Sequence, residues 1–192
     1  MKNKALFTLF VSALLAACTS EPSTPKPKGY FRIGVPEFTY EDFAKDSNAN
    51  MPYGFELNTS AGWETNPRQE LWGDVYYPSL RSRIQLTYKQ VDGNLDTLMM
   101  ESQKLAFKHT VKASGMGEQQ FINPEAKVYG MLYQINGNAA SPLQFYITDS
   151  TQHFLRGAVY FFSTPNADSL QPAVDFMKED VIHLIETAHW NE

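Results

Sequence analysis

Three short apolar segments joined by tight turns dominate the second half of this 192-residue chain. They span residues 127–135, 143–148 and 154–163, and the turn sequences NGN and DST lie between them. Short connections rich in Asn, Gly and Asp are typical of hairpins, so we expect the segments to pair as antiparallel neighbours. The third segment contains FLRGAVYFF, which is apolar on both faces from Ala158 onward. This pattern predicts a central strand that is covered on both sides.

An amphipathic helix is expected near the end of the chain. Apolar residues recur at spacings of three and four from Leu170 to Ala188, which places them on one face of a helix. Ser169 is the expected N-cap, and Pro172 would then lie in the first turn, where a proline is tolerated. The apolar face of this helix should pack on the sheet.

Similar spacing predicts an earlier helix at 95–111, ended by Gly115 and Gly117. Further strands are expected at 30–35, 53–57, 71–77, 84–89 and 118–122. This order predicts a single α+β domain, residues 30–192, with a mainly antiparallel sheet and two principal helices packed on it. The order of elements is loosely similar to that of the Mog1/PsbP-like fold.

Composition narrows the possible functions. The formal net charge is −5, and no run of five or more basic residues occurs. Because nucleic-acid binding needs clustered Lys and Arg side chains to contact phosphates, we expect no nucleic-acid partner. With 43% hydrophobic and 19% charged residues, the chain has the balance of a globular protein rather than of a disordered one.

The N-terminus has the pattern of a secretory signal. Two lysines precede an apolar stretch, residues 5–15, which is shorter than the roughly 20 residues that a membrane-spanning helix needs. The sequence LAAC then matches the bacterial lipoprotein box, and Cys18 is the only cysteine in the chain. Residues 1–17 are therefore predicted to be a lipoprotein signal peptide. The alternatives are a plain secretory signal and a chance cysteine.

Lipid attachment at Cys18 would anchor the mature protein to a membrane. The thiol accepts a diacylglyceryl group and the freed amine accepts an acyl chain such as palmitate; each buried CH₂ contributes about 0.8 kcal/mol, so several chains anchor stably. Residues 18–29 are rich in proline and predict an extended tether with a reach of roughly 34 Å. Thr19, rather than Asp, follows the cysteine, which favours the outer membrane, with the domain facing the periplasm. No cofactor is expected beyond these covalent groups.

A set of polar residues is predicted to cluster around the two turns. Its members are Asn138, Ser141, Asp149, Ser150, His153 and Arg156. Serine, histidine and aspartate can act as nucleophile, base and orienting group, but turns are rich in such residues for backbone reasons. Three interpretations stay open: turn chemistry, which is favoured, a polar interaction surface of all members except Ser150, and catalysis, which is least favoured. The sequence contains no catalytic motif and no metal-ligand spacing, so we expect neither an enzyme nor a metal site.

Residues 37–80 are dense in aromatic side chains, including Trp63 and Trp72. Rings of this kind usually pack in a core, which is the favoured interpretation. The alternative is a periplasmic ligand-binding module with an apolar pocket lined by these two rings.

Three long strings of sequence carry a family resemblance. They are PKPKGYFRI at the tether, KLAFKHTVKA on the first helix, and VYGMLYQINGNAASPLQFYITDSTQHFLRGAVYF across the three strands. Together they resemble the gliding-motility lipoprotein GldD family of the Bacteroidetes. The resemblance implies a non-enzymatic cell-envelope lipoprotein that is required for gliding and linked to type IX secretion, and whose partners are other proteins of that machinery. We expect it to support their assembly or stability. Of the family's residues, only the lipid-bearing cysteine carries over, onto Cys18.

Three short sequences are similar to the O-glycosylation pattern of Bacteroidetes envelope proteins, in which Asp precedes Ser or Thr and then a small or apolar residue. They contain Thr97, Ser150 and Ser169. Ser150 is the first candidate because its turn should be exposed. Thr97 and Ser169 lie at expected helix starts, where capping also explains them.

Overall fold

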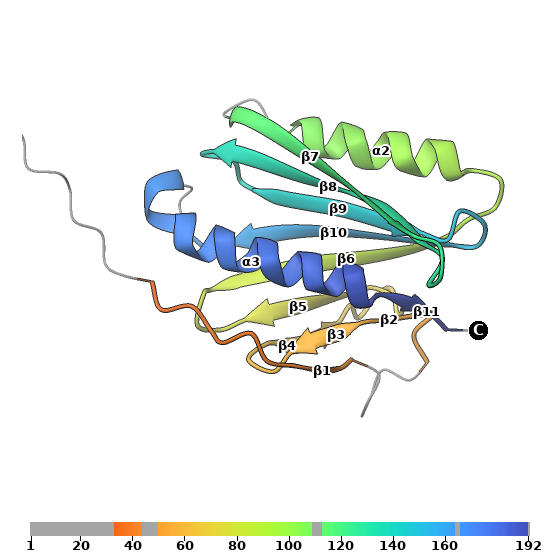
Figure 1. The fold of residues 1–192 in the computed structure, drawn as a ribbon, viewed down its shortest axis with the longest axis horizontal. Coiled ribbons are helices and arrows are strands. Elements are labelled where there is room, and N and C mark those ends of the chain that lie inside the picture. The colour runs from red at the N-terminus through yellow and green to blue at the C-terminus, as the bar shows by residue number, and fades with distance from the viewer. Residues whose placement is uncertain (1–32, 44–49, 109–112, 164–165, 192) are drawn as a thin grey trace, which may run out of the picture. The chain divides into compact units, whose positions relative to one another are not determined.

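A seven-stranded antiparallel sheet forms the centre of the fold, with strand order β4-β5-β6-β10-β9-β8-β7 (Figure 1). The computed structural model describes residues 33–43, 50–108, 113–163 and 166–191, which belong to the compact unit Phe31–Glu192. The strands are β4 (Gly62–Thr65), β5 (Gly73–Tyr77), β6 (Ser82–Gln90), β7 (Ala113–Asn123), β8 (Val128–Gly137), β9 (Leu143–Thr148) and β10 (His153–Phe161). The predicted α+β class is confirmed.

Two helices, α2 (Leu95–Lys108) and α3 (Ala167–Thr187), cover opposite faces of this sheet. Successive side chains of a strand point to opposite faces, so each inner strand contributes to two cores. On β10, Leu155 packs in the core that includes the apolar face of α3, whereas Phe154 packs in the core under α2. In Figure 1, α3 crosses in front of the strands.

Strand β10 lies at the middle of the sheet, between β6 and β9. Ala158 is 1% exposed and its neighbour Val159 is fully buried, although the two side chains point to opposite faces. The prediction of a central strand covered on both sides is therefore confirmed. The predicted strand 143–148 also matches β9 residue for residue.

The start of α3 differs from the sequence prediction. Asn166, not Ser169, is the N-cap, and the Asn166 side chain accepts a hydrogen bond from the Ser169 backbone N–H at 3.3 Å. Ser169 is the third residue of the helix instead. Because the helix begins at Ala167, Pro172 lies inside the helix rather than in its first turn. The apolar stripe that packs on the sheet is nevertheless the predicted one.

The prediction that Gly115 and Gly117 end the first helix is wrong. Helix α2 is described to Lys108, and both glycines lie in β7, which is longer than the predicted strand 118–122. Strand β7 pairs with β8 along nearly its whole length, with one register shift between Ala113 and Gly115, and it has no second neighbour among the described strands. Backbone pairing with β8 supplies the hydrogen bonds, and an exposed edge position needs no side chain to fill a core. This overrides the poor strand propensity of glycine.

Two small sheets attach the N-terminal residues to the domain. Strand β1 (Tyr40–Asp42) pairs with β3 (Glu56–Asn58), and β2 (Tyr53–Gly54) pairs with β11 (His189–Trp190). The expected strand 30–35 is not present over its described part, residues 33–35, because no neighbouring strand pairs with it there. The predicted strand 53–57 is divided into β2 and β3, and the prediction missed the short strand β4.

The aromatic-rich segment packs mostly in the core under α3. Phe43, Tyr53, Phe55 and Tyr77 are each at most 4% exposed. The ring of Phe43 stacks on that of Phe55 with centroids 4.5 Å apart, and Trp63 meets Phe43 edge-on at 4.7 Å. These contacts agree with the favoured interpretation of the segment. Within the ranges that the structure describes, no helix is both long enough and apolar enough to cross a membrane.

Candidate functional site

The polar set predicted around the two turns is not one site. Asn138 and Ser141 lie before β9, whereas Asp149 and His153 lie after it. The six residues of β9 separate the two turns by roughly 20 Å at about 3.4 Å per residue. The sequence analysis treated the two consecutive turns as neighbours in space. The turns flank β9, however, so they lie at opposite ends of the strand. The residues of the possible interaction surface therefore do not form one cluster, and neither do the serine, aspartate and histidine of the least favoured alternative, catalysis.

Ser141 and His153, two of the residues that catalysis would have used, each have a local structural role. Ser141 is fully buried and its hydroxyl donates to the backbone carbonyl of Leu143 at 3.3 Å. His153 Nδ1 hydrogen-bonds to the hydroxyl of Tyr88 at 2.7 Å, and its ring stacks on Trp190 with centroids 5.0 Å apart. No contact joins the serine to the histidine, so this arrangement cannot activate a nucleophile.

The carboxylate of Asp149 organises the turn between β9 and β10. One oxygen, Oδ1, accepts hydrogen bonds from the backbone N–H groups of Thr151, Gln152 and His153 at 3.0, 2.8 and 2.7 Å. The other oxygen accepts from the Thr151 hydroxyl at 2.6 Å. Burial by itself raises the pKa of Asp149, but these hydrogen bonds outweigh it and lower the pKa to about 2. The favoured interpretation, turn chemistry, describes this residue.

Replacing Asp149 by alanine is expected to destabilise the protein by about 2 kcal/mol, because three backbone N–H groups lose a charged acceptor. Since the folded-state pKa is lowered, the stabilisation is present above the ordinary value of 3.8 and is lost as the pH falls towards about 2. Urea titrations between pH 2 and pH 6 would measure this. Asp149→Asn keeps a neutral acceptor and should remove most of that acid sensitivity. An unchanged pH profile in this variant would contradict the assignment.

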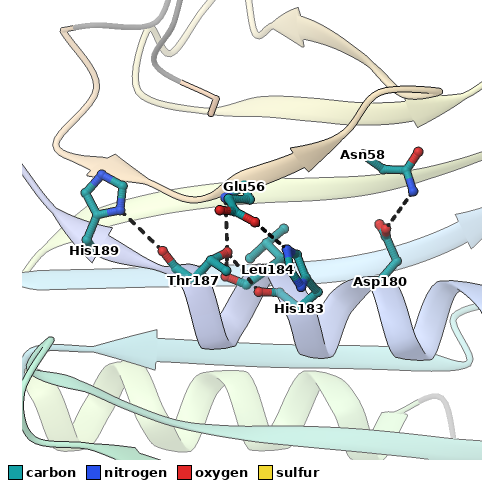
Figure 2. A network of polar contacts seen from close by, with 7 residues as sticks. All are labelled: Glu56, Asn58, Asp180, His183, Leu184, Thr187 and His189. Carbon is teal, nitrogen blue, oxygen red and sulfur yellow. Dashed lines mark hydrogen bonds and ion pairs between the residues drawn. The ribbon is translucent and has the colours of Figure 1, made fainter. Parts of the chain in front are cut away.

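A buried carboxylate that the sequence analysis missed lies on α3 (Figure 2). Asp180 is 4% exposed and accepts hydrogen bonds from Asn58 Nδ2 at 3.3 Å and from the Tyr77 hydroxyl, with Tyr40 as a further partner. Burial raises the pKa of Asp180, and these hydrogen bonds and the nearby His183 offset only part of that effect. One signal was present in the sequence: an acidic residue three positions after Met177 interrupts the apolar stripe.

The same network continues towards the end of α3. His183 Nε2 and Glu56 Oε2 are 2.7 Å apart, and the His183 ring stacks on Tyr40 with centroids 3.6 Å apart. The Thr187 hydroxyl accepts from the Glu56 backbone N–H at 3.0 Å (Figure 2). Groups with shifted pKa values often mark functional sites. The partners of Asp180 among the described residues all lie in β1, β3, β5 or α3. The network therefore holds these three strands against α3, which is a structural role.

A cavity of about 190 Å³ lies between α2 and the strands β6 and β10. Arg156 of β10 and Trp72 line it together, so one of the two rings proposed for a ligand pocket does reach a cavity, whereas Trp63 packs against Phe43. A guanidinium N–H group of Arg156 donates to Gln144 Oε1 at 2.6 Å. Burial lowers the pKa of Arg156. The sequence provides no reason to place Trp72 beside Arg156, because Trp72 directly precedes β5 whereas Arg156 lies in β10, and these two strands are far apart along the chain.

The remaining predicted site residues have simple placements. Ser150 and Thr97 are exposed, and Ser169 is half-buried with its hydroxyl donating to the Asn166 carbonyl. Ser150 also has a positive φ of 69°, consistent with its place in a tight turn. Glycosylation at these residues stays a prediction. Cys18 lies outside the described residues, and in the part of the chain that is described no group of three or more His, Cys, Asp or Glu side chains could hold a metal ion.

Comparison with known families assigns the chain. The family described as gliding motility lipoprotein GldD matches residues 20–190, which include every described strand and both helices. A comparison with curated proteins gives no match. The family match confirms the resemblance carried by the three sequence strings. The chain therefore belongs to the GldD family of gliding motility lipoproteins.

Proposed function

We propose that this GldD-family protein is a non-enzymatic lipoprotein that supports the assembly or stability of the gliding and type IX secretion machinery. It is held at the outer membrane, on the periplasmic side, by acyl groups on Cys18, and it needs no other cofactor. Its partners are other envelope proteins of the same machinery. The proposal rests on membership of the family, whose name assigns a lipoprotein of gliding motility.

One observation supports a role in binding rather than catalysis. The serine, aspartate and histidine that the least favoured alternative, catalysis, would have used are divided between the two ends of β9. The Asp149 carboxylate accepts hydrogen bonds from the backbone of its own turn, and the Ser141 hydroxyl donates to the backbone carbonyl of Leu143. These side chains therefore stabilise the fold. The proposal assigns contact with the partners to the surface of the domain.

Deletion of the gene is expected to abolish both colony spreading and type IX secretion, and the intact gene should restore both. Cys18→Ala should restore neither, because the acyl chains that supply membrane affinity cannot be attached. Immunoblots would establish equal protein levels, intact mass would report the acyl groups, and membrane fractionation would report the outer-membrane location.

Ser20→Ala is the matched control for this experiment, because it changes a nearby tether residue and leaves the lipoprotein box unaltered. It should restore spreading and secretion fully. A deletion strain that spreads and secretes normally would overturn the proposed function. Full rescue by Cys18→Ala would overturn the requirement for the lipid anchor.

A further inference from the structure

The cavity between α2 and the sheet combines apolar walls with three charged side chains, of which Lys89 and Glu101 pair with each other. Trp72, Leu98, Leu105 and Phe154 provide the apolar walls, and Arg156 is the third charged side chain. A volume of about 190 Å³ is smaller than the roughly 300–1,000 Å³ typical of drug-sized ligands. A group the size of an amino-acid residue fits this space.

The positive charge of Arg156 has no counterion among the described residues. Its one hydrogen-bond partner is the neutral amide oxygen of Gln144, at 2.6 Å, and no carboxylate lies within ion-pair distance of it in the described ranges. The Gln144 amide nitrogen is itself buried and unpartnered in that part of the chain. Half-buried charges are normally paired, since desolvation without a partner is unfavourable. Among the described residues, Arg156 therefore lacks the anionic partner that such a charge normally has.

The other charges at the cavity cancel each other. Lys89 Nζ and Glu101 Oε2 form an ion pair at 3.2 Å between β6 and α2. The lining thus carries one net positive charge, on Arg156. A monoanion balances that charge, whereas a dianion such as phosphate would exceed it and face the carboxylate of Glu101. The planar guanidinium also matches a carboxylate with two parallel N–H···O hydrogen bonds.

We propose that this cavity binds a carboxylate group carried on a small apolar body, with Arg156 as the anion-binding residue and Trp72 as an apolar wall. The carboxylate can come from a free small acid or from the C-terminus of a peptide, because both present the same chemistry. The site is independent of the lipid anchor and of the proposed role in machinery assembly.

The binding test uses the mature lipoprotein in a non-ionic detergent. Two pairs of probes separate the sources: N-acetyl-leucine against its amide, and Ala-Ala-Leu with a free against an amidated C-terminus. The chain has three tryptophans, so its indole N–H groups give few NMR signals, and Trp72→Phe assigns the one at the cavity. Both acids should shift that signal and both amides should not. Tighter binding of Ala-Ala-Leu indicates a peptide terminus as the natural source, and tighter binding of N-acetyl-leucine indicates a small acid.

Arg156→Gln should weaken binding of the acid about tenfold or more, because it removes a charge-assisted pair of hydrogen bonds. Lys104→Gln is the matched control, since it removes the same charge from an exposed position on α2 and should leave affinity unchanged. Glu101→Gln removes the negative charge at the cavity and should strengthen binding several-fold. That side chain is 56% exposed, so this variant tests the proposal even if Arg156→Gln fails to fold.

Stability without ligand provides a second readout. An Arg156 that serves binding has an unpaired charge in the free protein, so Arg156→Gln should melt at the same temperature as the parent or higher. Equal binding of acids and amides, an unmoved Trp72 signal, or undiminished affinity in a folded Arg156→Gln variant would each overturn the proposal.

Discussion

Replacing Gly130 by valine is expected to lower the melting temperature by about 6–12 °C, which corresponds to a loss of about 3 kcal/mol in a domain of this size. Gly130 lies in β8, opposite Ile147 of β9. A Cβ atom at this position would be 2.3 Å from the backbone carbonyl oxygen of Tyr146 and 2.8 Å from Ile147 Cγ2. Because the nearest atom belongs to the backbone of a buried inner strand, it cannot move aside as a flexible side chain would.

Gly117→Val is the matched control for this prediction. Gly117 also lies in a strand, β7, but a Cβ atom there would have no neighbour within 4 Å. The same substitution should therefore change stability by less than about 0.5 kcal/mol. Thermal unfolding followed by circular dichroism would measure both variants. Equal melting temperatures for the two would show that the contact around Gly130 does not restrict the side chain.

Tyr77→Phe is expected to destabilise the protein by about 2 kcal/mol at neutral pH, because the buried carboxylate of Asp180 loses a hydrogen-bond donor. Burial and the charge of Asp180 together raise the pKa of Tyr77, so the hydroxyl stays protonated and available to donate. Tyr76→Phe is the matched control: Tyr76 is the half-buried neighbour on the opposite face of β5, and its loss should cost less than about 0.5 kcal/mol.

The effect of Tyr77→Phe should depend on pH in a defined direction. Because burial raises the pKa of Asp180 above its ordinary value of 3.8, the folded protein retains a proton that the unfolded chain has already released. Stability from this group is therefore highest in acid and falls as the pH rises through that window. The Tyr77 hydrogen bond favours the ionised carboxylate, so removing it raises the pKa further.

The destabilisation by Tyr77→Phe should consequently be larger at pH 7 than at pH 4. Urea denaturation at both values, on the parent, Tyr77→Phe and Asp180→Asn, would measure it. Asp180→Asn removes the ionisable group and should abolish this pH dependence. An equal or larger penalty for Tyr77→Phe at pH 4 would contradict a carboxylate acceptor.

Elements with strong local periodicity were predictable. The strand at 84–89, which lies within β6, and the apolar stripe of α3 follow from alternation and from three-to-four spacing, which depend only on neighbouring residues. Element ends were less predictable. The extension of β7 back to Ala113 and the N-cap at Asn166 depend on a partner strand and on the local path of the chain, which periodicity does not encode.

The candidate sites show a sharper limit. Ser141 and Asp149 are eight residues apart, yet a straight strand keeps them apart in space. Asp180 and Tyr77 are 103 residues apart, yet they share a hydrogen bond. Sequence distance is a poor guide here because a strand holds nearby residues apart, while the packing of α3 on the sheet brings distant residues together.

Short turns, side-chain periodicity and long matching strings are local properties, so they were enough to predict the antiparallel sheet, the two covering helices and the family. Which polar groups meet depends instead on how the strands and helices pack. Strand β6 pairs with β10 rather than with the next strand along the chain, and this order creates the cavity that holds Arg156 and Trp72. That pairing results from burying both faces of one sheet at once, a condition that involves the whole chain and that no local pattern contains.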